Sequence, residues 1–210
     1  LNVLRDLSVK FKIDEIKGKG RILTFWGFQK RYHDRKDYSV PTIFDFAKKP
    51  IDINVPAYSE NWTIRGLDPS DFENFEDFIA AELEEKLTRF YKVKQETFEA
   101  IGGDDWDLMM VYTKLLDTYG ELCFSNLTKL CEAYLHVEDF VKQVKGMLNR
   151  NSEHFILIVS DHGIQRLGIT PFGKHSNYAF YSVNKPLKLS NPQITDFYGL
   201  IKKALKDAGT

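Results

Sequence analysis

Acidic and histidine residues follow predicted strands in this chain, and their types suit a divalent-metal site. The apolar run 155–159 (FILIV) leads directly into Ser160-Asp161-His162-Gly163. In an open α/β sheet, ligands bind at the carboxyl ends of strands, and Asp with His is a good ligand pair for a divalent ion. Gly163 would let the backbone turn sharply there. Taken alone, a turn cap at Asp161 beside a surface imidazole at His162 explains the same residues.

Two further segments carry candidate ligands. His175 lies on a predicted loop before the next strand, from which it could fold back over the strand ends. Asp117 and Glu121 follow the apolar run 106–112 and are four residues apart, so they share one helix face. Two carboxylates on one face repel each other unless a cation separates them. In isolation, a solvated helix start with Asp117 near the positive end of the helix dipole is the simpler explanation.

The elements that must position these residues alternate between strands and helices. Strands are predicted at 20–28, 51–55, 106–112, 155–159 and 178–183, and helices at 71–91, 127–148 and 194–205. The nearly continuous apolar runs are typical of strands buried on both faces. We therefore predict an α/β protein with a mainly parallel, doubly wound sheet, helices on both faces, and a single domain over 1–210. Asp117, Asp161, His162 and His175 should then converge at the carboxyl edge of one sheet.

Composition narrows the partners. The 210 residues are 43% hydrophobic, enough for a globular core. The formal net charge of −1 argues against a nucleic-acid polymer as partner. No apolar run approaches the roughly 20 residues of a membrane-spanning helix, and no signal-peptide pattern opens the chain. We expect a cytoplasmic protein with no membrane partner.

The two cysteines and one basic segment are further candidates for chemistry. Cys123 and Cys131 fit one predicted helix, in which they would be roughly 12 Å apart. A disulfide needs Cα atoms within about 7 Å, so we expect buried free thiols. The segment 30–37 (KRYHDRKD) could contact a phosphate-bearing substrate. Asp34 and Asp37 interrupt its charge and favour a solvated loop.

Several of these segments, in chain order, resemble the alkaline phosphatase superfamily, and most closely its type I phosphodiesterase/nucleotide pyrophosphatase branch with its archaeal relatives. Residues 106–122 (WDLMMVYTKLLDTYGEL) resemble the strand and D-x-x-G-H segment of the family. Residues 155–163 (FILIVSDHG) match its SDHG strand, and 173–184 (GKHSNYAFYSVN) resemble its final-histidine segment. Residues 42–56 and 192–201 resemble a helix–strand unit and a closing helix.

The resemblance implies metal-dependent hydrolysis of phosphate esters, by two divalent ions, commonly zinc, and a Thr or Ser nucleophile. By motif, Asp117, Glu121 and His175 would hold one ion. Asp161 and His162 would hold the other. Two ions can activate the nucleophile and neutralise the phosphoryl oxygens of an in-line displacement. The expected substrate is a small phosphate ester or a nucleotide.

The chain departs from the family pattern in two ways. Glu121 stands where the family has His, which shifts metal preference toward Mn²⁺ or Mg²⁺. The metal-binding Asp of the opening strand and the nucleophile are not recognised. Asp14 and Thr24 are poor candidates, because only ten positions separate them where the family has several tens.

These departures leave three functions open. If Leu1 is not the native start, the chain is part of a hydrolase whose front segment comes from elsewhere. Its partner is then a complementary N-terminal fragment or another copy of the chain. The second function is that of a degenerate, non-catalytic member acting as a binding or interaction protein. The third is an unrelated α/β binding domain in which these residues only decorate the surface.

Overall fold

The computed structural model describes residues 39–59, 67–103, 105–148, 154–186, 189 and 191–208. The chain separates into two compact units, Leu1–Ser39 and Val40–Thr210, and all the described helices and strands belong to the second. Asp14, Thr24, the strand predicted at 20–28 and the basic segment 30–37 lie outside the described residues. The single domain over 1–210 therefore stays a prediction.

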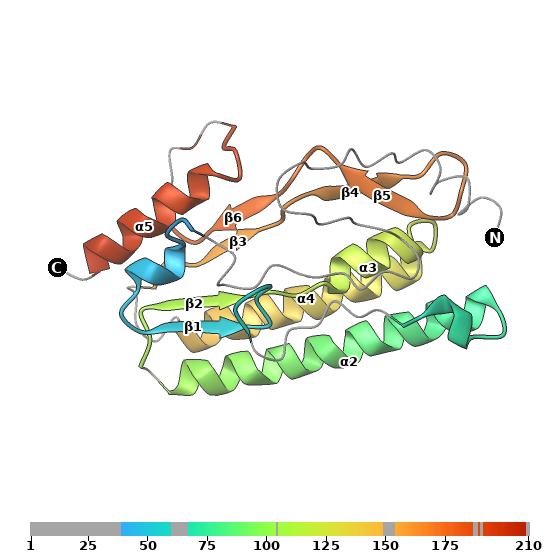
Figure 1. The fold of residues 1–210 in the computed structure, drawn as a ribbon, viewed down its shortest axis with the longest axis horizontal. Coiled ribbons are helices and arrows are strands. Elements are labelled where there is room, and N and C mark those ends of the chain that lie inside the picture. Colours follow the sequence, from blue (N-terminus) through green and yellow to red (C-terminus); the bar gives the residue numbers. More distant parts are fainter. Residues whose placement is uncertain are drawn as a thin grey trace. The chain divides into compact units, whose positions relative to one another are not determined.

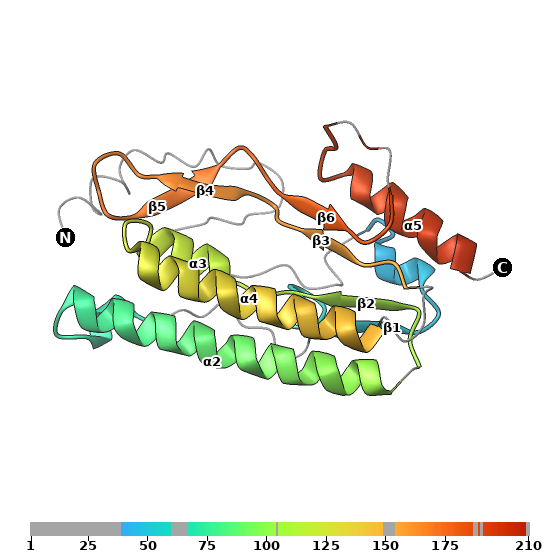
Figure 2. The ribbon, with the colours of Figure 1, turned by 180° about the vertical axis from the view of Figure 1, so that it is seen from behind.

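Three helices pack together and enclose the core of this unit (Figures 1 and 2). They are α2 (Phe75–Gly102), α3 (Leu115–Leu122) and α4 (Leu127–Leu148). Helix α2 begins where the side chain of Asn74 accepts a hydrogen bond from the backbone N–H of Asp77, a standard N-cap. It runs beyond the predicted end at residue 91, because buried side chains continue at helical spacing to Ile101.

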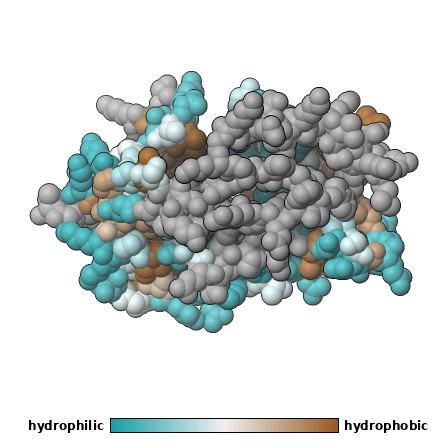
Figure 3. Space-filling model, viewed as in Figure 1, coloured by the Kyte–Doolittle hydropathy of each residue, from teal (hydrophilic) through white to brown (hydrophobic). Residues whose placement is uncertain are grey.

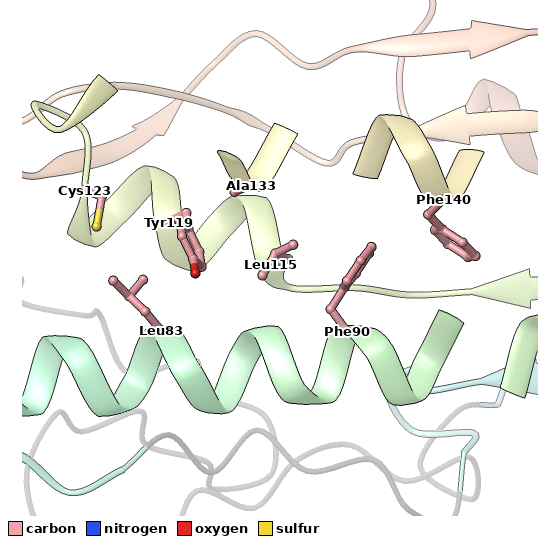
Figure 4. Close-up of a cluster of buried hydrophobic side chains, with 7 residues drawn as sticks. All are labelled: Leu83, Phe90, Leu115, Tyr119, Cys123, Ala133 and Phe140. Atoms are coloured by element: carbon pink, nitrogen blue, oxygen red, sulfur yellow. The ribbon is translucent and has the colours of Figure 1, made fainter. Parts of the chain in front are cut away.

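Buried side chains from all three helices form one hydrophobic cluster (Figure 4). The cluster comprises Leu83, Phe90, Leu115, Tyr119, Cys123, Ala133 and Phe140. Phe90 is 1% exposed, and its ring meets Phe140 edge to face with centroids 5.7 Å apart. Because Leu115 and Tyr119 belong to α3, this cluster fixes the helix that carries Asp117 and Glu121.

The strands of the described part form three separate two-stranded sheets. Strand β1 (Pro50–Ile53) runs parallel to β2 (Leu108–Val111). Strand β3 (Leu157–Val159) runs antiparallel to β6 (Tyr181–Val183), and β4 (Gly163–Arg166) runs antiparallel to β5 (Gly173–Ser176). The mixed α/β class is confirmed, and within the described residues the only parallel pair is β1 with β2.

Three short elements complete the described unit. Two 3₁₀ turns cover Ile43–Phe46 and Pro69–Asp71 and are labelled η2 and η3. Helix α5 (Asp196–Ala208) packs against η2, where the hydroxyl of Tyr198 donates to the carbonyl oxygen of Pro41 at 3.4 Å. The predicted closing helix is therefore present, two residues later than expected at its start.

The strands are less buried than the sequence predicts. Strands β2 and β3 are mostly half-buried rather than buried on both faces, and Met110 and Val159 are exposed. No helix of the described part is long and apolar enough to cross a membrane. On the face drawn in Figure 3, the described residues are mostly hydrophilic, with scattered hydrophobic ones.

The cysteines do not share a helix, contrary to the prediction. Cys123 follows the last residue of α3, whereas Cys131 lies in α4. The helix breaks between them because the side chain of Asn126 accepts a hydrogen bond from the backbone N–H of Lys129 and caps α4. Both thiols are free, but only Cys123 is buried.

Candidate metal centre

Helix α3 carries the two acidic candidates. Asp117 is the third residue of the helix, where the helix dipole favours a carboxylate, and its side chain is 20% exposed. Glu121 follows one turn later on the same face, as its spacing predicted. The helix begins after Lys114, whose carbonyl oxygen accepts a hydrogen bond from the backbone N–H of Thr118.

The hairpin formed by β4 and β5 packs directly on α3. His175 lies within β5, opposite Ile164 of β4, rather than on a loop as predicted. The approach is close because both facing positions are glycines. A Cβ at Gly120 would stand 2.7 Å from Cγ1 of Ile164, and a Cβ at Gly173 would overlap the carbonyl oxygen of Gly120. The pair of glycines therefore sets how near His175 comes to α3.

His162 lies between β3 and β4, at the point where the chain passes from one sheet to the next. Gly163 follows it, and a Cβ there would stand 2.8 Å from the carbonyl oxygen of Tyr178. The sequence assigned Gly163 to a sharp turn. The φ of Gly163 is not positive, so a glycine is needed there for the close approach of the Tyr178 backbone instead.

The side chains of Asp117, His162 and His175 meet at one point. Oδ1 of Asp117 lies 3.4 Å from Nε2 of His175 and 3.7 Å from Nε2 of His162. The two imidazole rings stack with centroids 3.6 Å apart and planes 16° from parallel. One ligand atom from each residue lies within 4.8 Å of the other two, close enough for all three to bind a single metal ion.

The carboxylate oxygen at the centre of this cluster lacks a hydrogen bond. Oδ1 of Asp117 is buried, and no donor among the described residues reaches it with hydrogen-bond geometry. Leaving a buried acceptor unpaired costs about 1–3 kcal/mol, and more for a charged group. A divalent cation would satisfy this oxygen and the nearby imidazole nitrogens together, so the residues present fit a metal ion.

Glu121 reaches the cluster through His175. Its Oε1 lies 3.0 Å from Nε2 of His175, within hydrogen-bonding distance. Burial raises the pKa of Glu121, and the charge of Asp117 raises it further, while Lys114 and His175 act in the opposite direction. Because the same Nε2 of His175 also faces Asp117, Glu121 is placed to share a bound ion with His175 or, without an ion, to hold His175 by a hydrogen bond.

Asp161 is the most loosely placed of the predicted ligands. Its side chain is 80% exposed, and its Oδ1 lies 3.6 Å from Nε2 of His162. The same oxygen accepts a hydrogen bond from the backbone N–H of His162 at 3.1 Å. Asp161 is thus beside the cluster, with a carboxylate open to solvent.

Two residues of the site were not singled out from the sequence. Burial raises the pKa of Tyr112 to about 12, with further contributions from the charges of Asp117 and Asp161. Nζ of Lys114 lies 3.6 Å from Oδ2 of Asp117. Both residues fall between β2 and α3. Tyr112 ends the strand predicted at 106–112 and Lys114 lies two residues beyond it, so their position at the carboxyl end of a predicted strand was a usable signal.

The predicted ligands do not come from one sheet. Asp117 follows β2, His162 follows β3 and His175 lies in β5, and these strands belong to three different sheets in the described part. The prediction of convergence at a single sheet edge was wrong in that respect, since the hairpin pairs antiparallel and packs on α3. No protein-family model, curated protein or solved structure matches this chain.

Proposed function

We propose that this chain is a metal-dependent hydrolase of phosphate esters, of the phosphodiesterase or nucleotide pyrophosphatase kind, in which Asp117, His162 and His175 hold a divalent ion. One observation carries the metal centre: the buried Oδ1 of Asp117 has no hydrogen bond and faces two imidazole nitrogens. The ester substrate rests on the resemblance of the three segments that supply these residues.

The chain's own groups suit this chemistry. A bound divalent ion would supply the positive charge that polarises a phosphoryl oxygen. The stacked rings of His162 and His175 restrict one another, which limits reorganisation on binding. Burial raises the pKa of Tyr112 to about 12, so its hydroxyl keeps its proton at neutral pH and can donate a hydrogen bond as well as accept one. Zinc suits the imidazoles, whereas the carboxylates add preference for manganese or magnesium.

A second ion and a larger sheet belong to the same proposal. With two ions bound, His162 would go to the second ion together with Asp161, whose carboxylate is open to solvent beside it, and Asp117, Glu121 and His175 would hold the first. Residues that complete this set would come from outside the described part of the chain. The doubly wound parallel sheet of an alkaline-phosphatase-like core would grow from the parallel pair of β1 and β2.

A non-catalytic binding protein on the same fold is the second candidate. Its support is that, among the described residues, no hydrogen bond joins a Ser or Thr hydroxyl to Asp117, Glu121, His162 or His175. Thr24 remains a candidate nucleophile. The proposed partners are a small phosphate ester or nucleotide, and either an N-terminal fragment or another copy of the chain. The proposed location is the cytoplasm.

Metal binding and turnover separate these candidates. Calorimetric titration with Mn²⁺ and Zn²⁺ should show binding to the wild-type chain and to Glu138→Gln, an exposed change on α4, but not to Asp117→Asn. Bis(4-nitrophenyl) phosphate and 4-nitrophenyl phosphate then report hydrolysis, which we expect to be weak without a supplied nucleophile. Turnover that needs the metal supports the hydrolase. Binding without turnover supports the non-catalytic protein, and no binding contradicts the metal centre.

A further inference from the structure

The two oxygens of Asp117 face different groups. Oδ1 is the buried oxygen that faces His162 and His175. Oδ2 lies 3.6 Å from Nζ of Lys114, one turn back along the chain. The carboxylate therefore lies between the two imidazoles and the ammonium group of Lys114, and the two sides can act on one bound molecule.

Lys114 is held at this place by the backbone. It is the N-cap residue of α3, and its carbonyl oxygen accepts the first hydrogen bond of the helix from the N–H of Thr118. Thr113, the residue before Lys114, also holds the start of the helix, because its hydroxyl accepts a hydrogen bond from the N–H of Leu115. The side chain of Lys114 is 39% exposed, so its ammonium group reaches solvent at the rim of the cluster.

The carboxylates of the site carry more negative charge than one divalent ion can offset. Asp117, Glu121 and Asp161 contribute three carboxylates around the two imidazoles. A divalent ion offsets only part of that negative charge, and an anionic ester arriving at the site meets the remainder. Lys114 supplies a further positive charge next to Asp117 and opposes the negative field at Glu121.

We propose that the ammonium group of Lys114 is the anion-binding group of this site and contacts the phosphate oxygens of an ester held at the metal ligands. This inference rests on the proposed function. The ion pair of Lys114 with Asp117 is long and half-exposed, and pairs of this kind are weak. Once the charge of Asp117 is shared with a bound cation, its pull on Lys114 falls further. The three N–H donors of Lys114 are then available to phosphate oxygens.

Inorganic phosphate is the probe for this role. The full chain is loaded with Mn²⁺, and phosphate is titrated into wild type, Lys114→Met, Lys114→Arg and Lys145→Met by calorimetry. Lys145 is an exposed lysine in the last turn of α4, and Lys145→Met is the matched control because it also removes one positive charge. We expect Lys114→Met to bind Mn²⁺ at least as tightly as wild type, because a cation beside Asp117 is removed, but to bind phosphate at least about fivefold more weakly. Lys114→Arg and Lys145→Met should stay near wild type.

The outcomes distinguish this inference from the metal centre on which it rests. If Lys114→Met binds Mn²⁺ and loses less than about fivefold in phosphate affinity, Lys114 is only an ion-pair partner of Asp117 and the inference is overturned. An equal loss in Lys145→Met also overturns it, since the effect is then one of net charge alone. If the wild-type chain binds no Mn²⁺, both the proposed function and this inference fail.

Discussion

Gly173 and Gly120 are in contact through their backbones, so that strand β5 lies directly on helix α3. A Cβ at Gly173 would overlap the carbonyl oxygen of Gly120 and stand 2.6 Å from Cγ2 of Ile164. Neither obstacle is the flexible end of a side chain. Any side chain at residue 173 must therefore push the hairpin away from the helix.

Gly173→Ala should destabilise the fold and loosen the candidate metal centre. Overpacking of this kind costs about 1–3 kcal/mol in the free energy of unfolding. The same displacement would lengthen the 3.0 Å contact of Glu121 with His175. Urea unfolding measures the first effect, and Mn²⁺ affinity measures the second.

Gly146→Ala is the matched control for that change. Nothing lies within 4 Å of a Cβ at Gly146, which is inside α4. Alanine is favoured over glycine in a helix by up to about 1 kcal/mol, so this variant should be neutral or more stable. Equal stability of the two variants would show that α3 and the hairpin are not in close contact.

Glu121→His tests the choice of metal. The substitution replaces a carboxylate by an imidazole beside His175, and so should shift preference from manganese or magnesium toward zinc. Melting temperatures of wild type and variant with each ion provide the measurement. In both proteins the ion should stabilise more at neutral than at acidic pH, because protons compete for the carboxylate and imidazole atoms. A melting temperature that no ion changes in either protein would leave Asp117 and Glu121 as a solvated helix start.

The acid limb of stability should depend on Asp139. Its carboxylate accepts hydrogen bonds from Lys94 of α2 at 2.7 Å and from Gln143 of α4 at 2.6 Å. Both bonds lower the pKa of Asp139, and the bond from Lys94 has the larger effect. A carboxyl group whose pKa is lower in the folded than in the unfolded state stabilises the fold at pH values above its unfolded-state pKa. This contribution is lost as the pH falls through the folded-state pKa. Asp139→Asn should therefore flatten the pH dependence of urea unfolding on the acid side of about pH 5, while Glu138→Gln keeps the wild-type slope. An unchanged slope in Asp139→Asn would contradict the link between α2 and α4.

The two thiols should differ in reactivity. Cys131 is exposed, whereas Cys123 is buried, and burial raises the pKa of its thiol. Because the thiolate is the reactive form, a disulfide reagent should modify Cys131 quickly and Cys123 slowly. Cys131→Ser should remove the fast phase, and Cys123→Ser should remove the slow one. Two equal fast phases would mean that the helix cluster around Cys123 opens readily.

Local patterns predicted the helices better than the sheets. Helix α4 has the predicted bounds because its apolar side chains repeat at helical spacing over 22 residues. Strand pairing depends on contacts between distant segments, which periodicity does not reveal. The β4–β5 hairpin did have a local signal in the sequence, namely Gly168 between its two strands. In the structure this glycine adopts a φ of +57 in the turn.

The residue types of the candidate centre followed from the sequence, but their relations did not. The spacing of Asp117 and Glu121 predicted a shared helix face correctly. That His175 meets Glu121 depends on a glycine contact between two elements, and no single segment encodes it. The role proposed for Lys114 depends on which oxygen of Asp117 it faces, which only the folded backbone determines.

The contact of α3 with the hairpin also bears on when the site forms during folding. Glu121 and His175 are 54 positions apart, so a long loop must close before they meet. Helices α3 and α4 and the β4–β5 hairpin can each form from local contacts earlier and faster. The donor set is therefore a late product of folding, absent from the transition state if that state is built on local contacts. An ion that binds it would then slow unfolding far more than it speeds refolding.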